Sequence, residues 1–217
     1  KTGKEERKWV GHYGAITSLA FAKNGSALIS GSVDAQVKVW RAEQSSGHDV
    51  IQAHGDWVQT LALHPKNQLL ATGARDGSVK IWDTPTAKLV LKLPDLKGAV
   101  TAVAFSSHKD KLFLAAATRD DKNEGAIKVW QIDGDAKQGY KAVDKHDLKG
   151  HAKGVTSLAF HPHDENANLL VSGSADHTVK LWTIDTGKEK NTYKLHKDEV
   201  RCVAFTLDGR NFASGGR

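Results

Sequence analysis

Short segments that alternate apolar residues with small or polar ones recur along the chain and predict β-strands. Segments 16–21, 58–63, 100–105, 155–160 and 200–205 are rich in β-branched and apolar residues. Asp-Gly, Asp-His and Asn-Gly pairs separate such segments from their neighbours, as the turns of β-hairpins do. No stretch keeps an apolar period of 3.6 residues across two helical turns. The pattern therefore predicts an all-β protein with almost no helix.

These segments belong to a repeat of about 40 to 50 residues. A tryptophan that follows an aliphatic residue closes the third segment of four units, as Trp40, Trp82, Trp130 and Trp182. A histidine opens most units, as His12, His54, His151 and His196. Each unit predicts four short strands, of which the outermost is polar. Because one such sheet cannot bury its own faces, the repeat predicts sheets arranged radially.

The motifs in these units resemble WD40 repeats. The matching pairs are Gly11-His12 with Val39-Trp40, Ala53-His54 with Ile81-Trp82, and Gly150-His151 with Leu181-Trp182. Residues 172–182, SGSADHTVKLW, carry the strongest signature. The resemblance implies an all-β fold, a β-propeller of four-stranded antiparallel blades in a single domain, 1–217. The blades are expected at about 11–53, 54–95, 96–150 and 151–195, with a partial fifth at 196–217.

Both ends of the chain match strands of a blade. Residues 2–5, Thr-Gly-Lys-Glu, repeat residues 186–189 of the fourth unit, so 1–10 is expected to form an outer strand. Residues 212–217 match the second strand of a fifth unit, which makes the domain incomplete at its C-terminal end. Most propellers of the resembling family are seven-bladed. The resemblance therefore implies a larger ring, completed by further blades or by another chain.

In the resembling family, a histidine, a Ser or Thr, an aspartate and the tryptophan form a buried, hydrogen-bonded tetrad. Carried over, the structural tetrads are His12, Ser30, Asp34 and Trp40; His54, Thr72, Asp76 and Trp82; and His151, Ser172, Asp176 and Trp182. These residue types also make up catalytic triads, but recurrence in three units favours architecture, because an enzyme needs one site. The third unit has Leu96, Ala116 and an inserted turn at 121–125, so we expect no tetrad there.

In the same family, partners dock on the face around the central channel. The matching positions here are Ala15, Thr17, Val33, Trp57, Gln59, Arg75, Ala99, Thr101, Arg119, Gly154, Thr156, Ala175, Glu199, Arg201 and Arg217. Arginine recurs in this set and lysine is absent from it, although lysine is plentiful elsewhere. A guanidinium binds carboxylate or phosphate through paired hydrogen bonds, and tryptophan is a large apolar anchor.

We therefore predict that this face binds a partner protein through an acidic or phosphorylated peptide, with Trp57 and Arg75 at its centre. The other predicted binding residues are Gln59, Thr101, Arg119, Glu199, Arg201 and Arg217. In the competing interpretation, Trp57 packs on a neighbouring blade and the arginines pair with nearby acids. Those acids would be Asp76, Asp120 and Asp198.

Composition and residue spacing bear on membrane insertion, disulfides, metal sites and enzymatic activity. The 217 residues are 39% hydrophobic and 26% charged, and no apolar run is long enough to insert into a membrane. Cys202, the one cysteine, excludes an internal disulfide, and its place in segment 200–205 predicts a core position. Of the histidines, only 161 with 163 and 146 with 151 lie close together, which is weak metal-ligand spacing. We expect no metal, no cofactor and no enzymatic activity.

A net charge of +6 leaves nucleic-acid binding as an alternative, although a disfavoured one. The loop and outer-strand lysines at 137, 141, 145 and 149 are interrupted by acids at 144 and 147, and we find no second aromatic platform beside Trp57. A structural subunit without a peptide site is a further alternative. The sequence slightly favours the cytoplasm, while an exported mature form stays open because the chain contains no methionine.

Overall fold

The computed structural model describes residues 5, 8–22, 25–41, 48–64, 68–106, 111–163 and 169–217. Over these ranges the backbone forms β-strands joined by turns, and no helix is present, as the apolar pattern predicts. Among the same residues, no helix has the length and apolarity that a membrane span requires.

The strands form four antiparallel sheets of four strands and a fifth sheet of two, which we call blades 1 to 5. Blade 1 contains β1 (Ile16–Phe21), β2 (Ala27–Ser32), β3 (Gln36–Arg41) and β4 (Asp49–Gln52). Blade 2 contains β5 (Val58–Leu63), β6 (Leu69–Ala74), β7 (Val79–Asp83) and β8 (Lys88–Lys92). Blade 3 contains β9 (Ala99–Phe105), β10 (Leu112–Arg119), β11 (Ile127–Asp135) and β12 (Gly139–Leu148).

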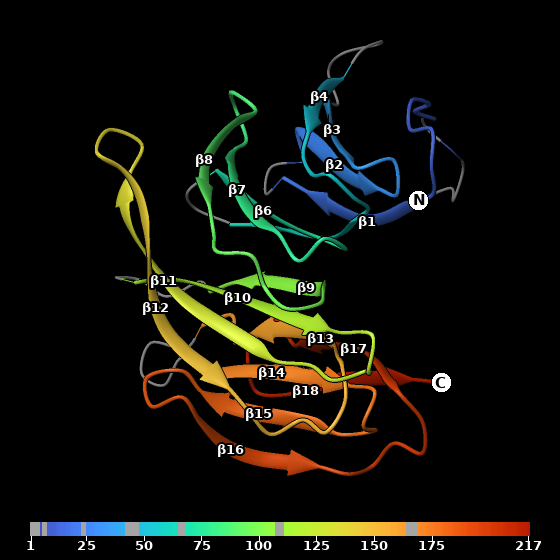
Figure 1. Ribbon diagram of the computed structural model, residues 1–217, viewed down its shortest axis with the longest axis vertical. Coiled ribbons are helices and arrows are strands. Elements are labelled where there is room, and N and C mark those ends of the chain that lie inside the picture. Colours follow the sequence, from blue (N-terminus) through green and yellow to red (C-terminus); the bar gives the residue numbers. More distant parts are fainter. Residues whose placement is uncertain are drawn as a thin grey trace.

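Blade 4 contains β13 (Val155–Phe160), β14 (Leu169–Ser174), β15 (Val179–Thr183) and β16 (Lys188–Tyr193). Blade 5 contains β17 (Val200–Phe205) and β18 (Phe212–Gly216). In each four-stranded blade the strands pair in chain order. The first strand of each blade packs beside the first strand of the next, so the blades follow one another around an arc (Figure 1). This is the arrangement of a β-propeller.

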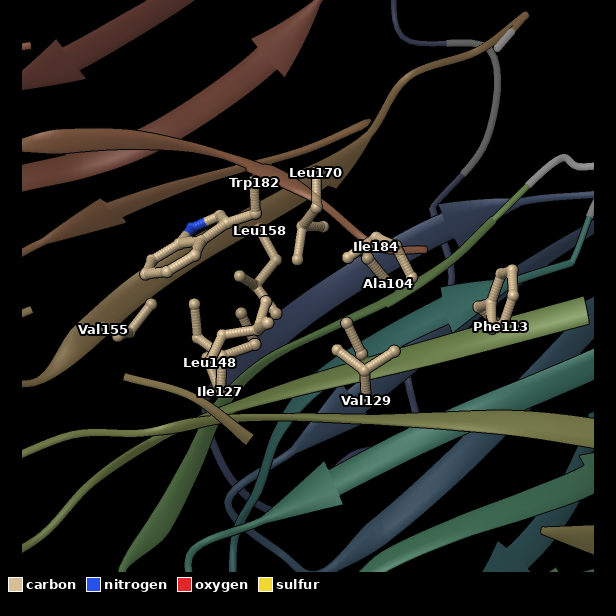
Figure 2. Packing of buried hydrophobic residues seen from close by; sticks show 13 residues of the cluster. Ala104, Phe113, Ile127, Val129, Leu148, Val155, Leu158, Leu170, Trp182 and Ile184 are labelled. Carbon is tan, nitrogen blue, oxygen red and sulfur yellow. The ribbon is translucent and has the colours of Figure 1, made fainter. Parts of the chain in front are cut away.

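The core lies between successive blades. At the joint of blades 3 and 4, Phe113, Val129 and Leu148 of blade 3 meet Leu158 and Trp182 of blade 4 (Figure 2). Phe113 and Val129 are fully buried. Because side chains on a strand alternate between the two faces of its sheet, each blade presents one apolar face to each neighbour. Burial of these faces, at about 25 cal/mol per Å² of apolar surface, holds the arc together.

Hydroxyl groups on the first strands add hydrogen bonds between blades. One set donates to the first carbonyl of the next blade's β-strand: Thr17 Oγ1 to Val58 O (2.6 Å), Thr101 Oγ1 to Val155 O (2.5 Å) and Thr156 Oγ1 to Val200 O (2.5 Å). A second set accepts a backbone N–H of the next blade: Ser18 Oγ from Leu61 (3.3 Å), Thr60 Oγ1 from Val103 (3.2 Å) and Ser157 Oγ from Val203 (3.1 Å).

These bonds are unevenly distributed. The joints of blades 1 with 2 and 4 with 5 contain both kinds. Gln59 stands where blades 1, 3 and 4 have the donating threonine, and Ala102 stands where blades 1, 2 and 4 have the accepting hydroxyl. Among the described residues, the two joints that flank blade 3 therefore contain one such hydroxyl bond each.

Cys202 corrects one expectation, because it is exposed rather than in the core. It occupies the position of Ser18 and Ser157, whose hydroxyls face the next blade along the arc. Blade 5 is the last blade of the arc, so no described blade covers that face of β17. Alternation predicts which face a residue is on, but a neighbouring sheet decides whether that face is buried.

The opposite end of the arc is open in the same way. Ile16, Leu19 and Phe21 of β1 are 55%, 56% and 68% exposed. The residues that match Ile16 in the other blades are fully buried: Val58, Val100, Val155 and Val200. The expected outer strand at 1–10 lies mostly outside the described residues. Within it, Lys8–Val10 belong to no strand, and the Trp9 ring lies 6.3 Å from the Trp40 ring, between centroids.

Candidate interaction face

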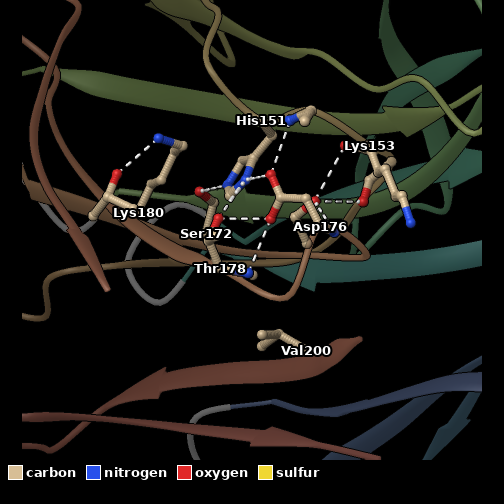
Figure 3. A network of polar contacts seen from close by, with 12 residues as sticks. His151, Lys153, Ser172, Asp176, Thr178, Lys180 and Val200 are labelled. Atoms are coloured by element: carbon tan, nitrogen blue, oxygen red, sulfur yellow. Dashed lines mark hydrogen bonds and ion pairs between the residues drawn. The ribbon is translucent and has the colours of Figure 1, made fainter. Parts of the chain in front are cut away.

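Blade 4 brings its expected tetrad together (Figure 3). His151 Nδ1 lies 2.9 Å from Asp176 Oδ2, and His151 Nε2 lies 2.8 Å from Ser172 Oγ. The indole N–H of Trp182 donates to the same Ser172 Oγ at 2.8 Å. The neutral His151 tautomer that satisfies every group has its proton on Nδ1, which donates to the Asp176 carboxylate. Its Nε2 then accepts a hydrogen bond from the Ser172 hydroxyl. One hydroxyl therefore serves both aromatic residues.

The tetrad aspartate is held in its charged form. Burial raises the pKa of Asp176, but hydrogen bonds from His151, Thr178 and the backbone N–H of Ala152 outweigh it, so the pKa lies well below the usual range. Ser172 is fully buried, as are Ser30 and Thr72 in the other tetrads. A hydroxyl in that setting has no face open to a substrate, which is what a nucleophile needs.

Blade 1 repeats this geometry. His12 lies 2.8 Å from Asp34 Oδ2 and 2.7 Å from Ser30 Oγ, and Trp40 Nε1–H donates to Ser30 Oγ at 2.8 Å. The residue after the aspartate, Ala35, has a φ of 64°, in the left-handed region. The turn after each tetrad aspartate thus requires a conformation that favours glycine.

In blade 2 a further side chain, Ser78, lies between the tetrad histidine and the tetrad aspartate. His54 Nδ1 lies 2.6 Å from Ser78 Oγ, and Ser78 Oγ donates to Asp76 Oδ1 at 2.5 Å. Thr72 Oγ1 joins His54 Nε2 (2.7 Å) and Trp82 Nε1 (2.9 Å) as expected. Burial, and secondarily the charge of a nearby lysine, lower the pKa of His54 to about 4. A role for Ser78 was not predicted from the sequence. Its signal would have been the hydroxyl residue two positions after the tetrad aspartate, which recurs in blade 4 as Thr178.

Blade 3 has no tetrad. Trp130 is buried to 1% exposure, and its Nε1–H has no hydrogen-bond partner among the described residues. Ala116, in the hydroxyl position, is fully buried, and Leu96, in the histidine position, packs against the blade 2–blade 3 core. Asp120 instead organises the inserted turn, where its Oδ1 accepts the N–H groups of Lys122 and Glu124 (3.0 and 2.8 Å).

We use the term rim for the channel-side positions at which the sequence predicts partner binding. Trp57 precedes β5 and is 45% exposed, and the Arg75 guanidinium lies 4.7 Å above its ring. Arg75 N–H also donates to Trp57 O at 2.9 Å, which fixes the two residues side by side. Among the described residues, no carboxylate lies within ion-pair distance of Arg75. Asp76 binds Ser78 and a backbone N–H instead.

A second part of the rim joins three blades. Arg119, at the end of β10, places Nη2 3.2 Å from Glu199 Oε1, and Arg201 Nη2 lies 2.8 Å from Glu199 Oε2. Between them lies Gly154, where a Cβ would sit 2.6 Å from Arg119 Cγ. The glycine therefore lets the arginine side chain cross blade 4 to reach blade 5. Asp198 takes no part in this group and accepts the N–H of Glu199.

The remaining rim residues are less concentrated. Thr101 already donates its hydroxyl to Ala117 O (3.2 Å) and Val155 O, and Thr156 and Thr17 are engaged in the same way. Gln59 is half-buried, and Arg217 is exposed with its N–H bonded to Glu199 O (3.2 Å). The rim thus contains an arginine on an exposed tryptophan ring and, separately, two arginines that share one carboxylate.

No three His, Cys, Asp or Glu side chains of the described ranges gather in a way that could hold a metal ion. His161 of the closely spaced histidine pair is bonded to the backbone, with Nε2 3.0 Å from Gly209 O. Its Nδ1 accepts the N–H of His163 (3.1 Å).

Comparison with known proteins gives several curated relatives. The chain is 26% identical over 216 residues to a guanine nucleotide-binding protein subunit beta of Oryza sativa subsp. japonica, across 94% of this chain and 54% of that protein. It is 27% identical to the small ribosomal subunit protein RACK1y of the same plant, across 80% and 49%. It is 31% identical to the nuclear distribution protein PAC1 of Arthroderma otae, across 76% and 35%. The chain thus spans about half the length of the first two relatives and about a third of the length of the third.

The sequence profile of the family described as WD domain, G-beta repeat matches residues 3–41, 47–83, 143–183 and 187–217. Each matched segment from 47 onward begins in or beside the outer strand of one blade and ends in the next blade. The strands β9 and β10 of blade 3 lie outside the matches. Since the matches cover more than half of the sequence, the chain belongs to the WD40 repeat family.

Proposed function

We propose that this protein is a non-enzymatic interaction scaffold whose rim binds an acidic or phosphorylated segment of a partner protein. The stacked pair Trp57 and Arg75 carries this proposal. A guanidinium with no carboxylate partner is ready to accept an anion, and the ring beneath it supplies an apolar surface of the kind that dominates interface energetics. Two relatives support a role in assemblies, since their names place them in a guanine nucleotide-binding protein and in the small ribosomal subunit.

The tetrads support the non-enzymatic part of the proposal. They contain the residue types of hydrolytic triads, but their hydroxyls are buried and each is shared between an indole and an imidazole. The same arrangement occurs in blades 1 and 4, at two separate places along the arc. Repetition of this kind serves architecture better than chemistry.

A retention experiment tests the proposal. The chain would be passed over immobilised random-flank peptide libraries with a central phosphoserine, glutamate or serine. We expect retention on the first or second library and none on the third, and a loss of at least tenfold with Trp57→Ala or Arg75→Ala. Arg210→Ala, in the turn between β17 and β18, is the matched control and should keep retention. Equal retention on all three libraries, or variants that lose retention only as they lose their melting transition, would contradict the proposal.

The exposed face of β1 favours a second role, as part of a larger ring. Leu19 is 56% exposed, while Leu158, in the same position of blade 4, is 9% exposed. We propose that a further blade, from additional sequence or from another chain, covers this face, since an open apolar sheet face promotes association. Native mass spectrometry of the protein from its source would reveal the covering chain. A monomer of these 217 residues alone, with the β1 amides exchanging freely, would contradict this role.

A further inference from the structure

The rim contains arginines in two different states. Arg75 faces outward over the Trp57 ring, with no carboxylate of the described chain at ion-pair distance. Arg119 and Arg201 already hold an anion, because the Glu199 carboxylate lies between them. An acidic ligand that reaches these three arginines therefore meets one open guanidinium and two that are occupied.

The occupied pair resembles a ligand site that contains its own ligand. Each Glu199 oxygen faces a different guanidinium, at 3.2 Å for Arg119 and 2.8 Å for Arg201. The contact with Arg119 is a hydrogen bond, whereas Oε2, which is buried, makes an ion pair with Arg201 without a hydrogen bond. Carboxylate and phosphate groups bind guanidinium groups through charge-assisted contacts of this kind. The side chains are partly accessible, with 32% of Arg119, 25% of Glu199 and 51% of Arg201 exposed. Since ion pairs with this exposure are weak, an external anion can compete with Glu199 for the two guanidinium groups.

The backbone around the pair is arranged so that the arginines can meet. Arg119 comes from blade 3 and Arg201 from blade 5, and the side chain of Arg119 crosses blade 4 over Gly154. Blades 1, 2 and 3 have Ala15, Trp57 and Ala99 at the position of Gly154, and blade 5 has Glu199 itself. A side chain there would push the guanidinium aside. Arg119 is thus brought to Glu199 from far away in the sequence, whereas Arg201 lies two residues from it.

We propose that Glu199 makes the rim selective for phosphorylated segments over merely acidic ones, an inference that rests on the anion-binding function proposed above. A ligand carboxylate that displaces Glu199 replaces one carboxylate by another and leaves Glu199 nearby as a repelling charge. A phosphate group has a charge of about −1.5 to −2 and three acceptor oxygens. Glu199 repels a phosphate as well, but the phosphate offers the two guanidinium groups more charge and more acceptor oxygens than Glu199 does, so that the gain outweighs the repulsion and the exchange favours it.

Small anions test this directly. The arginine Nε–Hε signals of the full chain would be assigned with single Arg→Lys variants and followed by NMR at pH 7.5 and constant ionic strength. Inorganic phosphate and acetate are the two probes. We expect both anions to shift Arg75, and phosphate alone to shift Arg119 and Arg201.

Glu199→Gln should remove the selectivity. In this variant acetate should shift Arg119 and Arg201 as well, and its apparent affinity there should rise about tenfold, the effect of one charge-assisted interaction. Asp121→Asn, which removes an exposed acid of the inserted turn, is the matched control and should leave acetate without effect at Arg119 and Arg201. If the glutamine variant does not fold, Glu199→Asp serves instead, because its shorter side chain retreats from Arg119 and should admit acetate at that residue.

The outcomes separate the two proposals. If phosphate leaves Arg119 and Arg201 unmoved, or if acetate shifts them equally in the unaltered chain, the role of Glu199 is overturned while an Arg75 response still supports rim binding. If neither anion shifts any of the three arginines, the anion-binding function itself fails. A phosphate response at Arg119 and Arg201 that survives unchanged in the glutamine variant, with acetate still inactive, would also overturn the selective role of Glu199.

Discussion

Blades 3 and 4 have the same architecture but meet the needs of their tryptophans differently. In blade 4, Ser172 accepts the indole N–H of Trp182 and links it to His151. In blade 3, the indole N–H of Trp130 is buried with no partner in the described part of the chain, and Leu96 and Ala116 contribute apolar atoms to the same core cluster. Both tryptophans are 1% exposed. The comparison shows that apolar alternation and strand register suffice to build a blade. The tetrad adds hydrogen-bond partners for the buried indole N–H and the imidazole.

The family profile covers the tetrad of blade 4 and leaves most of blade 3 unmatched. It matches 143–183, which contains the tetrad of blade 4, and leaves 84–142 unmatched. The unmatched region nevertheless contains β9 and β10, which pair from Leu114 opposite Phe105 to Arg119 opposite Ala99, with a bulge near one end as in the other blades. A blade without its polar signature is therefore structurally complete and yet poorly visible in sequence.

The largest expected effect comes from making blade 4 resemble blade 3. Ser172→Ala removes the acceptor of Trp182 and the partner of His151, so two buried polar groups lose hydrogen bonds. Since each such loss costs about 1–3 kcal/mol, we expect the unfolding free energy to fall by about 2–4 kcal/mol. Urea denaturation measures it. A change below about 0.5 kcal/mol would mean that the tetrad contributes little to stability.

Acid should affect the tetrads next. The pKa of Asp176 is lowered in the folded state, so its contribution to stability is complete above the ordinary value of 3.8 and is lost as pH falls through the folded pKa. Asp176→Asn should therefore show a shallower fall in unfolding free energy than the unaltered chain below pH 4. Parallel acid curves for the two proteins would contradict this expectation.

His54 should add a separate loss at milder pH. Its folded pKa of about 4 lies below the ordinary histidine pKa of 6.5, so the unfolded chain takes up a proton first as the pH falls. Stability should fall as pH drops from about 6.5 to about 4 and should fall no further through this group below that. NMR titration of its ring protons measures the midpoint. A midpoint near 6.5 would show that the histidine is charged where the Ser78 relay requires it to be neutral.

Restoring the tetrad in blade 3 should have a smaller effect. Ala116→Ser gives Trp130 an acceptor, and Leu96→His would give the new hydroxyl a partner. We expect a gain of about 1 kcal/mol from the serine, with the double variant more stable than the sum of the single changes. A double-mutant cycle by urea denaturation measures the coupling. Additive or unfavourable changes would show that the apolar packing of blade 3 has no room for a hydroxyl.

The smallest effect should come from the turns. His177, after the tetrad aspartate of blade 4, has a φ of 69°, whereas Gly77 fills the same place in blade 2 with a φ of 83°. His177→Gly relieves about 1–2 kcal/mol of left-handed strain but adds about 0.4–1 kcal/mol of unfolded-chain entropy. We therefore expect a gain below about 1 kcal/mol in thermal unfolding. A loss of stability would show that the His177 side chain makes contacts that outweigh the strain.

Much of the fold was predictable because the signals repeat in register. The strands that begin at Val58, Val155 and Val200 start at the residues that the alternation predicts. What escaped prediction depends on neighbours in space. Cys202 lies on the predicted strand, but it would be buried only if a further sheet packed against blade 5. Ser78 intervenes between a histidine and an aspartate because of its side-chain orientation, which no spacing encodes.

The rim shows the same division. Family positions predicted that Arg119, Glu199 and Arg201 all lie around the channel, but their union depends on a glycine in the blade between them. The competing interpretation paired the arginines with acids close in sequence, such as Asp120 and Asp198. Arg201 does pair with a nearby acid, Glu199, but Arg119 reaches the same carboxylate from 80 residues away, and sequence proximity gives no sign of that contact.

The offset between matched segments and blades has a consequence for how such a chain changes length. A segment such as 47–83 begins with the outer strand of one blade and ends with the third strand of the next. Duplicating or deleting such a segment leaves each four-stranded sheet complete, because three strands of a sheet come from one segment and its outer strand comes from the next. A segment that coincided with one blade would also leave the sheets complete, but it would share no sheet with its neighbour. A gene can therefore gain or lose one such segment and still encode neighbouring segments that are held together by hydrogen-bonded strands of the same sheet.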